Sequence, residues 1–269
     1  MNGVMEKFKR AGSLVCVGLD SELALLPEPF RNEAAPQFAF NSWVIEQTAE
    51  FAGAYKINAA FYEARGAADV REMERTVELL RDVAPYAVTI CDAKRADIGN
   101  TNRGYVESIF DVMGFDAVTL HPYLGREALA PFLEREDKLN IVLCRTSNPG
   151  AGELQDLSIE GKPLWQHVAA HVRMHWNTRG NCALVVGATW PEEMRTIRSL
   201  APELPFLVPG IGAQGGDLQA VLQAGLDAQG GGLMIASSRA IIFADDPRHA
   251  ARTLCNQIEA ARGGIAHAR

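Results

Sequence analysis

Eight short apolar runs, each ending in a polar or glycine-rich turn, alternate with helical segments along this chain. The runs are Leu14–Asp20, Ala54–Asn58, Tyr86–Asp92, Ala117–His121, Asn140–Arg145, Cys182–Ala188, Phe206–Pro209 and Gly232–Ser237. Helical patterns lie between them, such as Arg65–Val83 and Lys162–Thr178, and a last one, Pro247–Arg262, follows the eighth run. Strands that alternate with helices form a parallel sheet, and eight such units are the number that closes a TIM barrel. We therefore predict a single (β/α)8 TIM barrel of the α/β class.

The length of 269 residues is close to the roughly 250 that one such barrel needs. We predict one catalytic domain over residues 1–269, in which residues 263–269 form a disordered tail. An open, doubly wound sheet is the competing architecture. It would more naturally use fewer strands, and no GxGxxG turn follows the first run, as it does in the dinucleotide-binding form of that fold.

The composition argues against several classes of function. A net charge of −7 and a pI near 5.4 disfavour broad binding to nucleic acid or to anionic membranes. No stretch approaches the ~18 apolar residues of a membrane span, and the polar residues 1–10 have no signal-peptide core. The cysteines are widely spaced, without a CxxC or Cys/His ligand pattern. We expect reduced thiols, no metal site and a cytoplasmic protein.

In a TIM barrel the chemistry lies at the carboxyl ends of the strands. Polar residues stand at this position after several runs: Asp20, Lys56, Asn58, Asp92, Lys94, His121, Arg145, Ser147, the Pro209–Gly216 turn and Arg239. A purely structural barrel has little reason to collect charged groups at one end. The longest irregular segment, Thr146–Gly161, follows the fifth run, and a loop of this length in a compact domain is more often functional than passive.

The segment Asp92-Ala93-Lys94-Arg95-Ala96-Asp97 carries the strongest chemical signal, because it predicts a lysine held between two aspartates, Asp92 and Asp97. Alternation along a strand puts Asp92 and Lys94 on one face, at the mouth of the barrel, and Asp20 and Lys56 add a second pair at neighbouring strand ends. Lysines alternating with carboxylates stay protonated while the carboxylates stay ionised. Such an ammonium group is suited to stabilising a developing carbanion and then protonating it. The alternative is a solvated ion pair, which does little.

A glycine-rich turn, Pro209–Asp217, follows the seventh run and opens a helix. Glycines let backbone N–H groups approach an anion, and the start of a helix adds a favourable dipole. Gln214 can donate its amide, and the guanidinium of Arg239 can hold a phosphate in two places. Barrels frequently bind phosphate at the loops after these two strands. We therefore favour a phosphate site over a simple strand-to-helix turn.

Together these residues closely resemble the orotidine 5′-phosphate decarboxylase family, in particular its longer-chain bacterial branch. The matching segments are Val17-Gly18-Leu19-Asp20, Lys56-Ile57-Asn58, Asp92-Ala93-Lys94-Arg95-Ala96-Asp97-Ile98-Gly99-Asn100-Thr101, Ser147-Asn148-Pro149-Gly150, Pro209-Gly210-Ile211-Gly212-Ala213-Gln214 and Ser238-Arg239. They run in the family order and span nearly the whole chain. One departure is Gly99, where shorter members commonly carry proline.

The resemblance implies decarboxylation of orotidine 5′-phosphate to uridine 5′-phosphate, the last step of de novo pyrimidine synthesis, with no metal or organic cofactor. By this likeness Lys94 protonates C6 as carbon dioxide leaves, and Asp92 lies beside the substrate carboxylate. Lys56 and Asp20 would order the charged groups and the ribose hydroxyls.

The resemblance also implies a homodimer with shared sites, in which Asp97 enters the neighbouring subunit's site and Thr101 contacts the ligand there. The residues expected to bind substrate are Asp20, Asn58, Thr101, Ser147, Pro209, Gln214, Ser238 and Arg239. Of these, Ser147 would hydrogen-bond the pyrimidine, whereas Gln214 and Arg239 would bind the phosphate.

Two other functions remain open at this point. A related sugar-phosphate decarboxylase or synthase on the same barrel would use a divalent metal, and a catalytically silent nucleotide-binding barrel would bind without turnover. A Schiff-base lysine is less suited, because an ammonium flanked by carboxylates is a poor nucleophile. His121 is interpreted as a polar wall of the pocket. His167, His171 and His175 share one helical face away from the strand ends, which favours a solvated outer face over a metal site.

Overall fold

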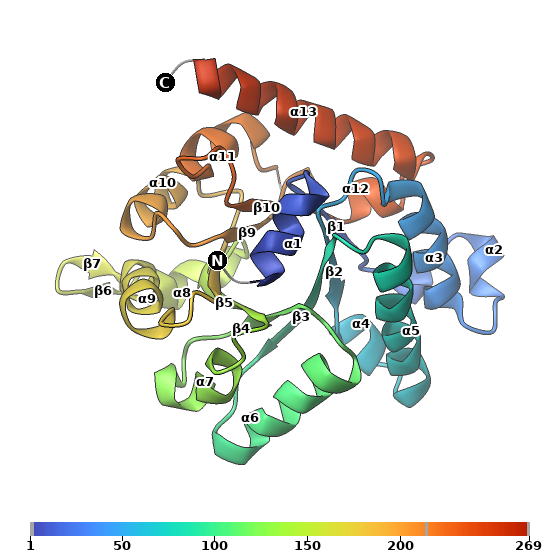
Figure 1. Ribbon diagram of the computed structural model, residues 1–269, viewed down its shortest axis with the longest axis horizontal. Helices are drawn as coiled ribbons and strands as arrows, with labels where there is room; N and C mark the ends of the chain where they lie inside the picture. Colours follow the sequence, from blue (N-terminus) through green and yellow to red (C-terminus); the bar gives the residue numbers. More distant parts are fainter. Residues whose placement is uncertain (1–2, 213–214, 268–269) are drawn as a thin grey trace.

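The computed structural model describes residues 3–212 and 215–267, and these form a closed barrel of parallel strands surrounded by helices (Figure 1). The barrel strands are β1 (Val15–Gly18), β2 (Ala54–Asn58), β3 (Val88–Arg95), β4 (Ala117–Leu120), β5 (Leu139–Arg145), β8 (Cys182–Val186), β9 (Phe206–Pro209) and β10 (Leu233–Ser237). Around the ring they are hydrogen-bonded in the order β1-β10-β9-β8-β5-β4-β3-β2. Each strand overlaps one predicted run, although β3 continues beyond its run to Arg95 and β5 begins one residue before its run. The predicted barrel is confirmed.

Helices follow the strands and cover the outside of the ring (Figure 1). They are α1 (Gly3–Ala11), α2 (Glu28–Arg31), α3 (Pro36–Thr48), α4 (Ala60–Glu63), α5 (Ala67–Val83), α6 (Gly99–Val106), α7 (Gly125–Leu133), α8 (Gly152–Gln155), α9 (Leu164–His171), α10 (Pro191–Leu200), α11 (Leu218–Gly225), α12 (Arg239–Ile242) and α13 (Pro247–His267). Single 3₁₀ turns occur at Leu23–Leu25 and Pro149–Ala151, and π-helical turns at Glu107–Val112 and Val172–Trp176.

The first helix, α1, lies over the centre of the ring in Figure 1 and closes the amino-terminal end of the barrel. Its apolar residues Val4 and Phe8 are buried, and Lys7 Nζ lies 2.6 Å from the carboxylate of Asp116, directly before β4. Because this end is covered, the barrel opens to solvent at the carboxyl ends of its strands. All four cysteines in barrel strands are buried and free, as expected.

Several predicted boundaries differ from the structure, most of all in the loop after β5 and at the last helix. The Thr146–Gly161 segment is not wholly irregular, because it contains a 3₁₀ turn, α8 and β6 (Ser158–Ile159), which pairs with β7 (Lys162–Pro163). The helix predicted from Lys162 therefore begins only after β7. The last helix continues to His267, so the described part of the tail predicted to be disordered is helical. Within residues 3–212 and 215–267, no helix combines the length and the hydropathy that a membrane span requires.

Candidate active site

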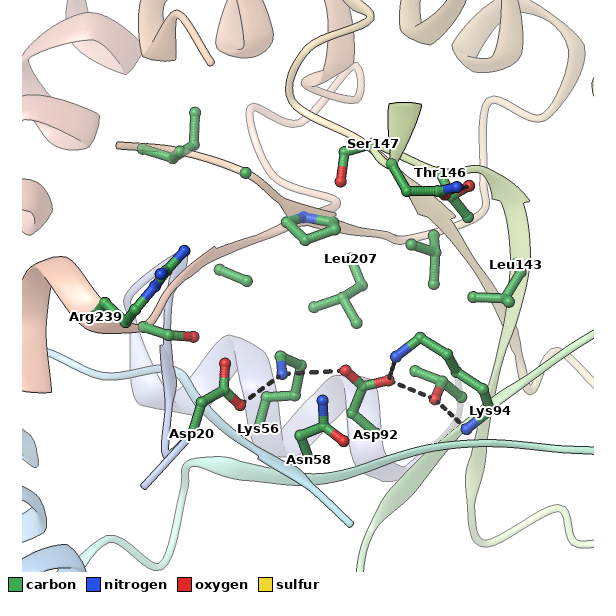
Figure 2. Close-up of a pocket in the computed structure, with 18 of the residues that line it drawn as sticks. Asp20, Lys56, Asn58, Asp92, Lys94, Leu143, Thr146, Ser147, Leu207 and Arg239 are labelled. Atoms are coloured by element: carbon green, nitrogen blue, oxygen red, sulfur yellow. Dashed lines mark hydrogen bonds and ion pairs between the residues drawn. The ribbon is translucent and has the colours of Figure 1, made fainter. Parts of the chain in front are cut away.

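A cavity of about 540 Å³ lies at the carboxyl ends of the barrel strands (Figure 2). The polar side chains and the backbone groups that line this cavity belong to Asp20, Lys56, Asn58, Asp92, Lys94, Thr119, Thr146, Ser147, Asn148, Gln155, Pro209, Gly210, Ser238 and Arg239. Apolar lining comes from Leu143, Val185, Leu207, Ile211 and Ala236. A volume of this size suits a small organic ligand, and the lining is polar enough to orient one.

Four charged side chains of alternating sign form a row along one wall of the cavity (Figure 2). Lys56 Nζ lies 3.3 Å from Asp20 Oδ1 and 3.1 Å from Asp92 Oδ2. Lys94 Nζ lies 2.7 Å from the other carboxylate oxygen, Asp92 Oδ1. Asp92 therefore bridges two ammonium groups, and Lys56 bridges two carboxylates.

The two most buried members of the row, Lys56 and Asp92, are both charged. Burial opposes the ionisation of Asp92, but the ammonium groups of Lys56 and Lys94 outweigh it and lower the pKa of Asp92 to about 2. Burial also opposes the charge on Lys56, but Asp92 and Asp20 raise its pKa above the ordinary value. The side chain of Lys94 is 50% exposed, so its ammonium group is accessible to a ligand in the cavity.

Lys94 reaches the cavity through an irregular part of β3. The register of β3 against β4 shifts between Cys91 and Arg95. Lys94 has a φ of 48°, in the left-handed region that residues with a side chain seldom adopt. Asp92 and Lys94 both line the cavity, as predicted, but a local bulge places Lys94 there and the simple alternation of an unbroken strand does not.

The loop after β5 is fixed to the barrel through Arg145 and Trp190. The guanidinium of Arg145 is buried, lies 3.1 Å from Asp156 Oδ1, and stacks on the ring of Trp190 with a centroid distance of 4.0 Å. Trp190 Nε1 in turn donates to the carbonyl oxygen of Thr146 at 2.9 Å. Arg145 does not line the cavity; it anchors the loop that does.

Two glycines allow site residues to approach neighbouring strand ends. A Cβ on Gly187 would lie 2.9 Å from the Cβ of Ser147, which follows β5. A Cβ on Gly18 would overlap Ser238 Oγ, which follows β10. A side chain at either position would therefore displace a residue that lines the cavity.

The glycine-rich turn after β9 provides backbone rather than a helix end. Gly210 has a left-handed φ of 109°, and α11 does not begin until Leu218. The carboxylate of Asp217 accepts the N–H groups of Gln219 and Ala220, in the first turn of α11, at 2.9 and 3.3 Å. The predicted contribution of the helix dipole to anion binding is therefore wrong, because the chain's own carboxylate occupies that position. Gln214 lies outside the described residues.

Arg239 lies at the Asp20 end of the charged row, whereas Lys94 lies at the other end (Figure 2). Arg239 is exposed, and within residues 3–212 and 215–267 its guanidinium has no protein partner. An exposed, unpaired guanidinium beside the Pro209–Ile211 backbone is suited to an anionic group of a ligand.

Asp97 and Thr101 do not line the cavity of their own chain. The carboxylate of Asp97 accepts the N–H of Ile98 at 2.7 Å, and Thr101 is exposed on α6. The prediction of a lysine held between two aspartates is therefore wrong for a single chain, because Lys94 pairs with Asp92 and Asp97 faces elsewhere.

A model of the "Orotidine 5'-phosphate decarboxylase / HUMPS family" matches residues 13–254. The chain belongs to this family. The matched range includes every residue that lines the cavity, and the resemblance inferred from the six sequence segments is confirmed.

Relatives in the orotidine 5′-phosphate decarboxylase family match over most of the chain. A protein of that name from Cellvibrio japonicus is 46% identical over 96% of this chain and 98% of its own length. The structure of Leishmania donovani OMP decarboxylase is 40% identical, covers 97% of this chain and 99% of that chain, and has a TM-score of 0.88. The Leishmania donovani UMP synthase structure is 43% identical with a TM-score of 0.88, and the match covers 96% of this chain but 55% of that one.

The cavity brings together most of the residues that the sequence singled out as an orotidine 5′-phosphate decarboxylase site. Those that line it are Asp20, Lys56, Asn58, Asp92, Lys94, Ser147, Pro209, Ser238 and Arg239. His121, expected as a polar wall, does not line it. Sequence reasoning missed Thr119 and Gln155, although a lone threonine in the apolar run Ala117–Leu120 is a signal that was available.

Proposed function

We propose that this protein, a carbon–carbon lyase, decarboxylates orotidine 5′-phosphate to uridine 5′-phosphate, the last step of de novo pyrimidine synthesis. It does so without a metal or organic cofactor, as a cytoplasmic homodimer. The observation that carries the proposal is the row Asp20–Lys56–Asp92–Lys94 on one wall of a cavity, with the exposed guanidinium of Arg239 at its Asp20 end. Membership of the decarboxylase family supports the same substrate.

The two ends of the charged row bind the two ends of a nucleotide, the phosphate at the Asp20 end and the base at the Lys94 end. Arg239, Ser238 and the backbone around Pro209 bind the phosphate at the Asp20 end, together with Gln214. Asp20 and Lys56 order the ribose hydroxyls in the middle, and Asn58 adds a contact there. Ser147, across the cavity from the row in Figure 2, hydrogen-bonds the pyrimidine. This orientation brings C6 of the base toward Lys94.

The chemical step is the exchange of a carboxylate for a proton at C6. The bond from C6 to the carboxylate carbon breaks, carbon dioxide leaves, and the electron pair stays on C6. The Lys94 ammonium group stabilises that charge and then gives C6 its proton, and the neutral amine regains a proton from solvent. At ~4 Å and an effective dielectric of ~20, such an ion pair contributes about 4 kcal/mol before desolvation is counted.

Asp92 supports this step in two ways. Its low pKa of about 2 keeps it ionised at neutral pH, so it pairs with the Lys94 ammonium group before the reaction. Lying beside the substrate carboxylate, it also repels that group, and the repulsion disappears as carbon dioxide leaves. Lys56, bonded to its other oxygen at 3.1 Å, prevents Asp92 from moving away.

The proposed homodimer accounts for the residues that the cavity lacks. Ile98, between Asp97 and Thr101, is 60% exposed, and Tyr123 in the loop after β4 is 85% exposed. Large apolar side chains that are exposed in this way favour a partner surface. In the dimer Asp97 reaches the partner's site and Thr101 contacts the ligand there.

The test is direct. Purified protein is incubated with orotidine 5′-phosphate and EDTA while the ultraviolet absorbance of the pyrimidine is followed. We expect conversion to uridine 5′-phosphate at an undiminished rate, no conversion by Lys94→Ala, and full activity in the control Lys9→Ala, an exposed lysine of α1 at the opposite end.

Failure of the unmodified protein to release carbon dioxide would refute the function. Loss of activity in EDTA that returns with a divalent cation would refute the cofactor-free mechanism and favour the metal-dependent relatives. Tight binding of uridine 5′-phosphate without turnover would identify a silent nucleotide-binding barrel.

A further inference from the structure

The hydroxyl group of Thr119 makes two hydrogen bonds to the charged segment of β3. Thr119 lies on β4, is 1% exposed and lines the cavity. Its Oγ1 accepts the backbone N–H of Lys94 at 3.0 Å and donates to Asp92 Oδ1 at 2.8 Å. One hydroxyl can accept and donate at the same time, so this side chain holds both the backbone of Lys94 and the carboxylate paired with it.

The first of these bonds stabilises the bulge in β3. Where the register of β3 against β4 shifts, backbone groups leave the regular ladder, and a buried N–H without a partner costs free energy. The Thr119 hydroxyl takes the N–H of Lys94 at this point, next to a residue with a φ of 48°. It therefore holds the backbone turn that sends the Lys94 side chain into the cavity.

The second bond orients the Asp92 carboxylate. Oδ1 accepts from Thr119 and from Lys94 Nζ, and Oδ2 accepts from Lys56 Nζ. The two lysine side chains are long and flexible, whereas the threonine hydroxyl is one bond from a Cβ fixed in a barrel strand. Thr119 is thus the rigid donor that sets the plane of the carboxylate, and the carboxylate in turn places the Lys94 ammonium group.

We propose that Thr119 is a positioning residue for decarboxylation, an inference that rests on the proposed function. It acts through Asp92 and Lys94 by keeping the ammonium group where it can protonate C6. Misplacing a reacting group by about 1 Å can cost roughly 100-fold in rate. Phosphate, ribose and base are held by other residues, so the loss falls on kcat rather than KM.

The other end of the barrel supplies a matched control. Thr89 on β3 is 2% exposed, accepts the backbone N–H of Asp116 at 3.0 Å and donates to the Asp116 carboxylate at 3.0 Å. That carboxylate also pairs with a lysine, Lys7. Thr89 therefore has the same bonding pattern as Thr119, but it lies away from the cavity.

The experiment compares Thr119→Val with Thr89→Val, since valine keeps the shape and removes the hydroxyl. Each variant loses one accepted and one donated hydrogen bond. The two variants should therefore lose similar thermal stability. We expect kcat for orotidine 5′-phosphate to fall about 10- to 100-fold in Thr119→Val with KM little changed, and to stay near wild type in Thr89→Val. Equal kcat in Thr119→Val and wild type, or equal losses in the two valine variants, would overturn the proposal.

A second pair covers the case in which Thr119→Val does not fold. Thr119→Ser and Thr119→Ala differ only in the hydroxyl, so serine should restore most of the kcat that alanine loses; equal kcat values would overturn the proposal. Wild-type protein without decarboxylase activity would refute the function and not the positioning. In that case a crystal structure of Thr119→Ala tests the positioning role. An unchanged distance of 2.7 Å between Lys94 Nζ and Asp92 Oδ1 would overturn the proposal.

Discussion

Asp92 is the residue on which the charged row depends, because each of its carboxylate oxygens binds a different lysine. Lys56 is buried against Oδ2, and Lys94 reaches Oδ1 from the open side of the cavity. The two lysines therefore have different tasks although their chemistry is the same. Lys56 fixes the carboxylate from its buried side, and Lys94 faces the ligand.

The depressed pKa of Asp92 predicts a specific loss of stability in acid. The pKa is 3.8 for the unperturbed group and about 2 in the folded protein, so the carboxylate contributes about 2 kcal/mol above pH ~5. A lowered carboxyl pKa means that this contribution is lost as the pH falls from about 4 toward 2. Urea denaturation should therefore show the difference in unfolding free energy between wild type and Asp92→Asn shrinking by about 1 kcal/mol between pH 5 and 3. A difference that stays constant over this range would contradict the assignment.

Arg239 predicts a dependence on the phosphate group. A charge-assisted bond contributes about 1.5 to 3 kcal/mol, so Arg239→Ala should lower kcat/KM for orotidine 5′-phosphate about 10- to 100-fold. The same variant should leave the slow turnover of orotidine, which lacks the phosphate, nearly unchanged. Steady-state kinetics with both substrates measure this, with Arg195→Ala, an exposed arginine of α10, as the control. Equal losses on the two substrates would show that Arg239 does not bind phosphate.

At the scale of elements, the site depends on two departures from regular barrel geometry. One is the bulge that ends β3, and the other is the loop after β5, which the Arg145–Asp156 ion pair and Trp190 attach to the barrel. Both lie at the carboxyl ends of the strands. The regular parts of the barrel hold these two segments in position, and the segments carry Lys94 and Ser147.

The anchor of the β5 loop predicts a binding defect. Trp190→Phe keeps a ring under Arg145 but removes the hydrogen bond to the Thr146 carbonyl, which contributes about 1 kcal/mol. We expect a several-fold increase in KM for orotidine 5′-phosphate, because Ser147 follows Thr146 directly, and a drop in unfolding free energy of about 1 kcal/mol. Trp43→Phe on α3 is the control, since this tryptophan packs against Phe30 far from the loop. An unchanged KM in Trp190→Phe would show that the loop needs no such anchor.

The sequence predicts regular elements better than these departures, for a physical reason. A mostly buried strand is a nearly continuous apolar run, so β9 has the predicted bounds, and β2 has them although it contains Lys56. The bulge at Lys94 depends on the hydroxyl of Thr119, which follows it by 25 residues. Helix α8 depends on tertiary contacts such as the hydrogen bonds between Gln155 and Thr146. Asp217 before α11 is different, because an aspartate at that position is a recognised cap and was open to prediction.

At the scale of the whole molecule, a single chain leaves its site without Asp97. The charged row is complete in one chain, since all four members belong to segments that converge on one cavity. In the proposed homodimer the alternation Asp20–Lys56–Asp92–Lys94 is continued by the partner's Asp97 after Lys94. Under the proposed shared site, catalysis requires two chains, although each chain folds its own barrel.

Subunit mixing tests this requirement. Lys94→Ala and Asp97→Ala homodimers should both be inactive, and an exchanged mixture should regain about a quarter of wild-type activity, because half of its dimers carry one intact site of two. Lys94→Ala mixed with Asp92→Ala is the control, since each heterodimer then has a defect in both sites. Absence of recovery in the first mixture, after exchange has been verified by mass spectrometry, would exclude the shared site.

The pairing of β1 with β10 has a consequence for how the chain is made. The ring closes between Val15–Val17 and Ile235–Ser237, so a ribosome must synthesise nearly the whole polypeptide before the first strand meets its final neighbour. Until then the growing sheet exposes two unpaired edges, which favour association with other chains. Arg239 emerges just after β10, so a nascent chain acquires its last proposed phosphate contact almost at the moment when its sheet can close.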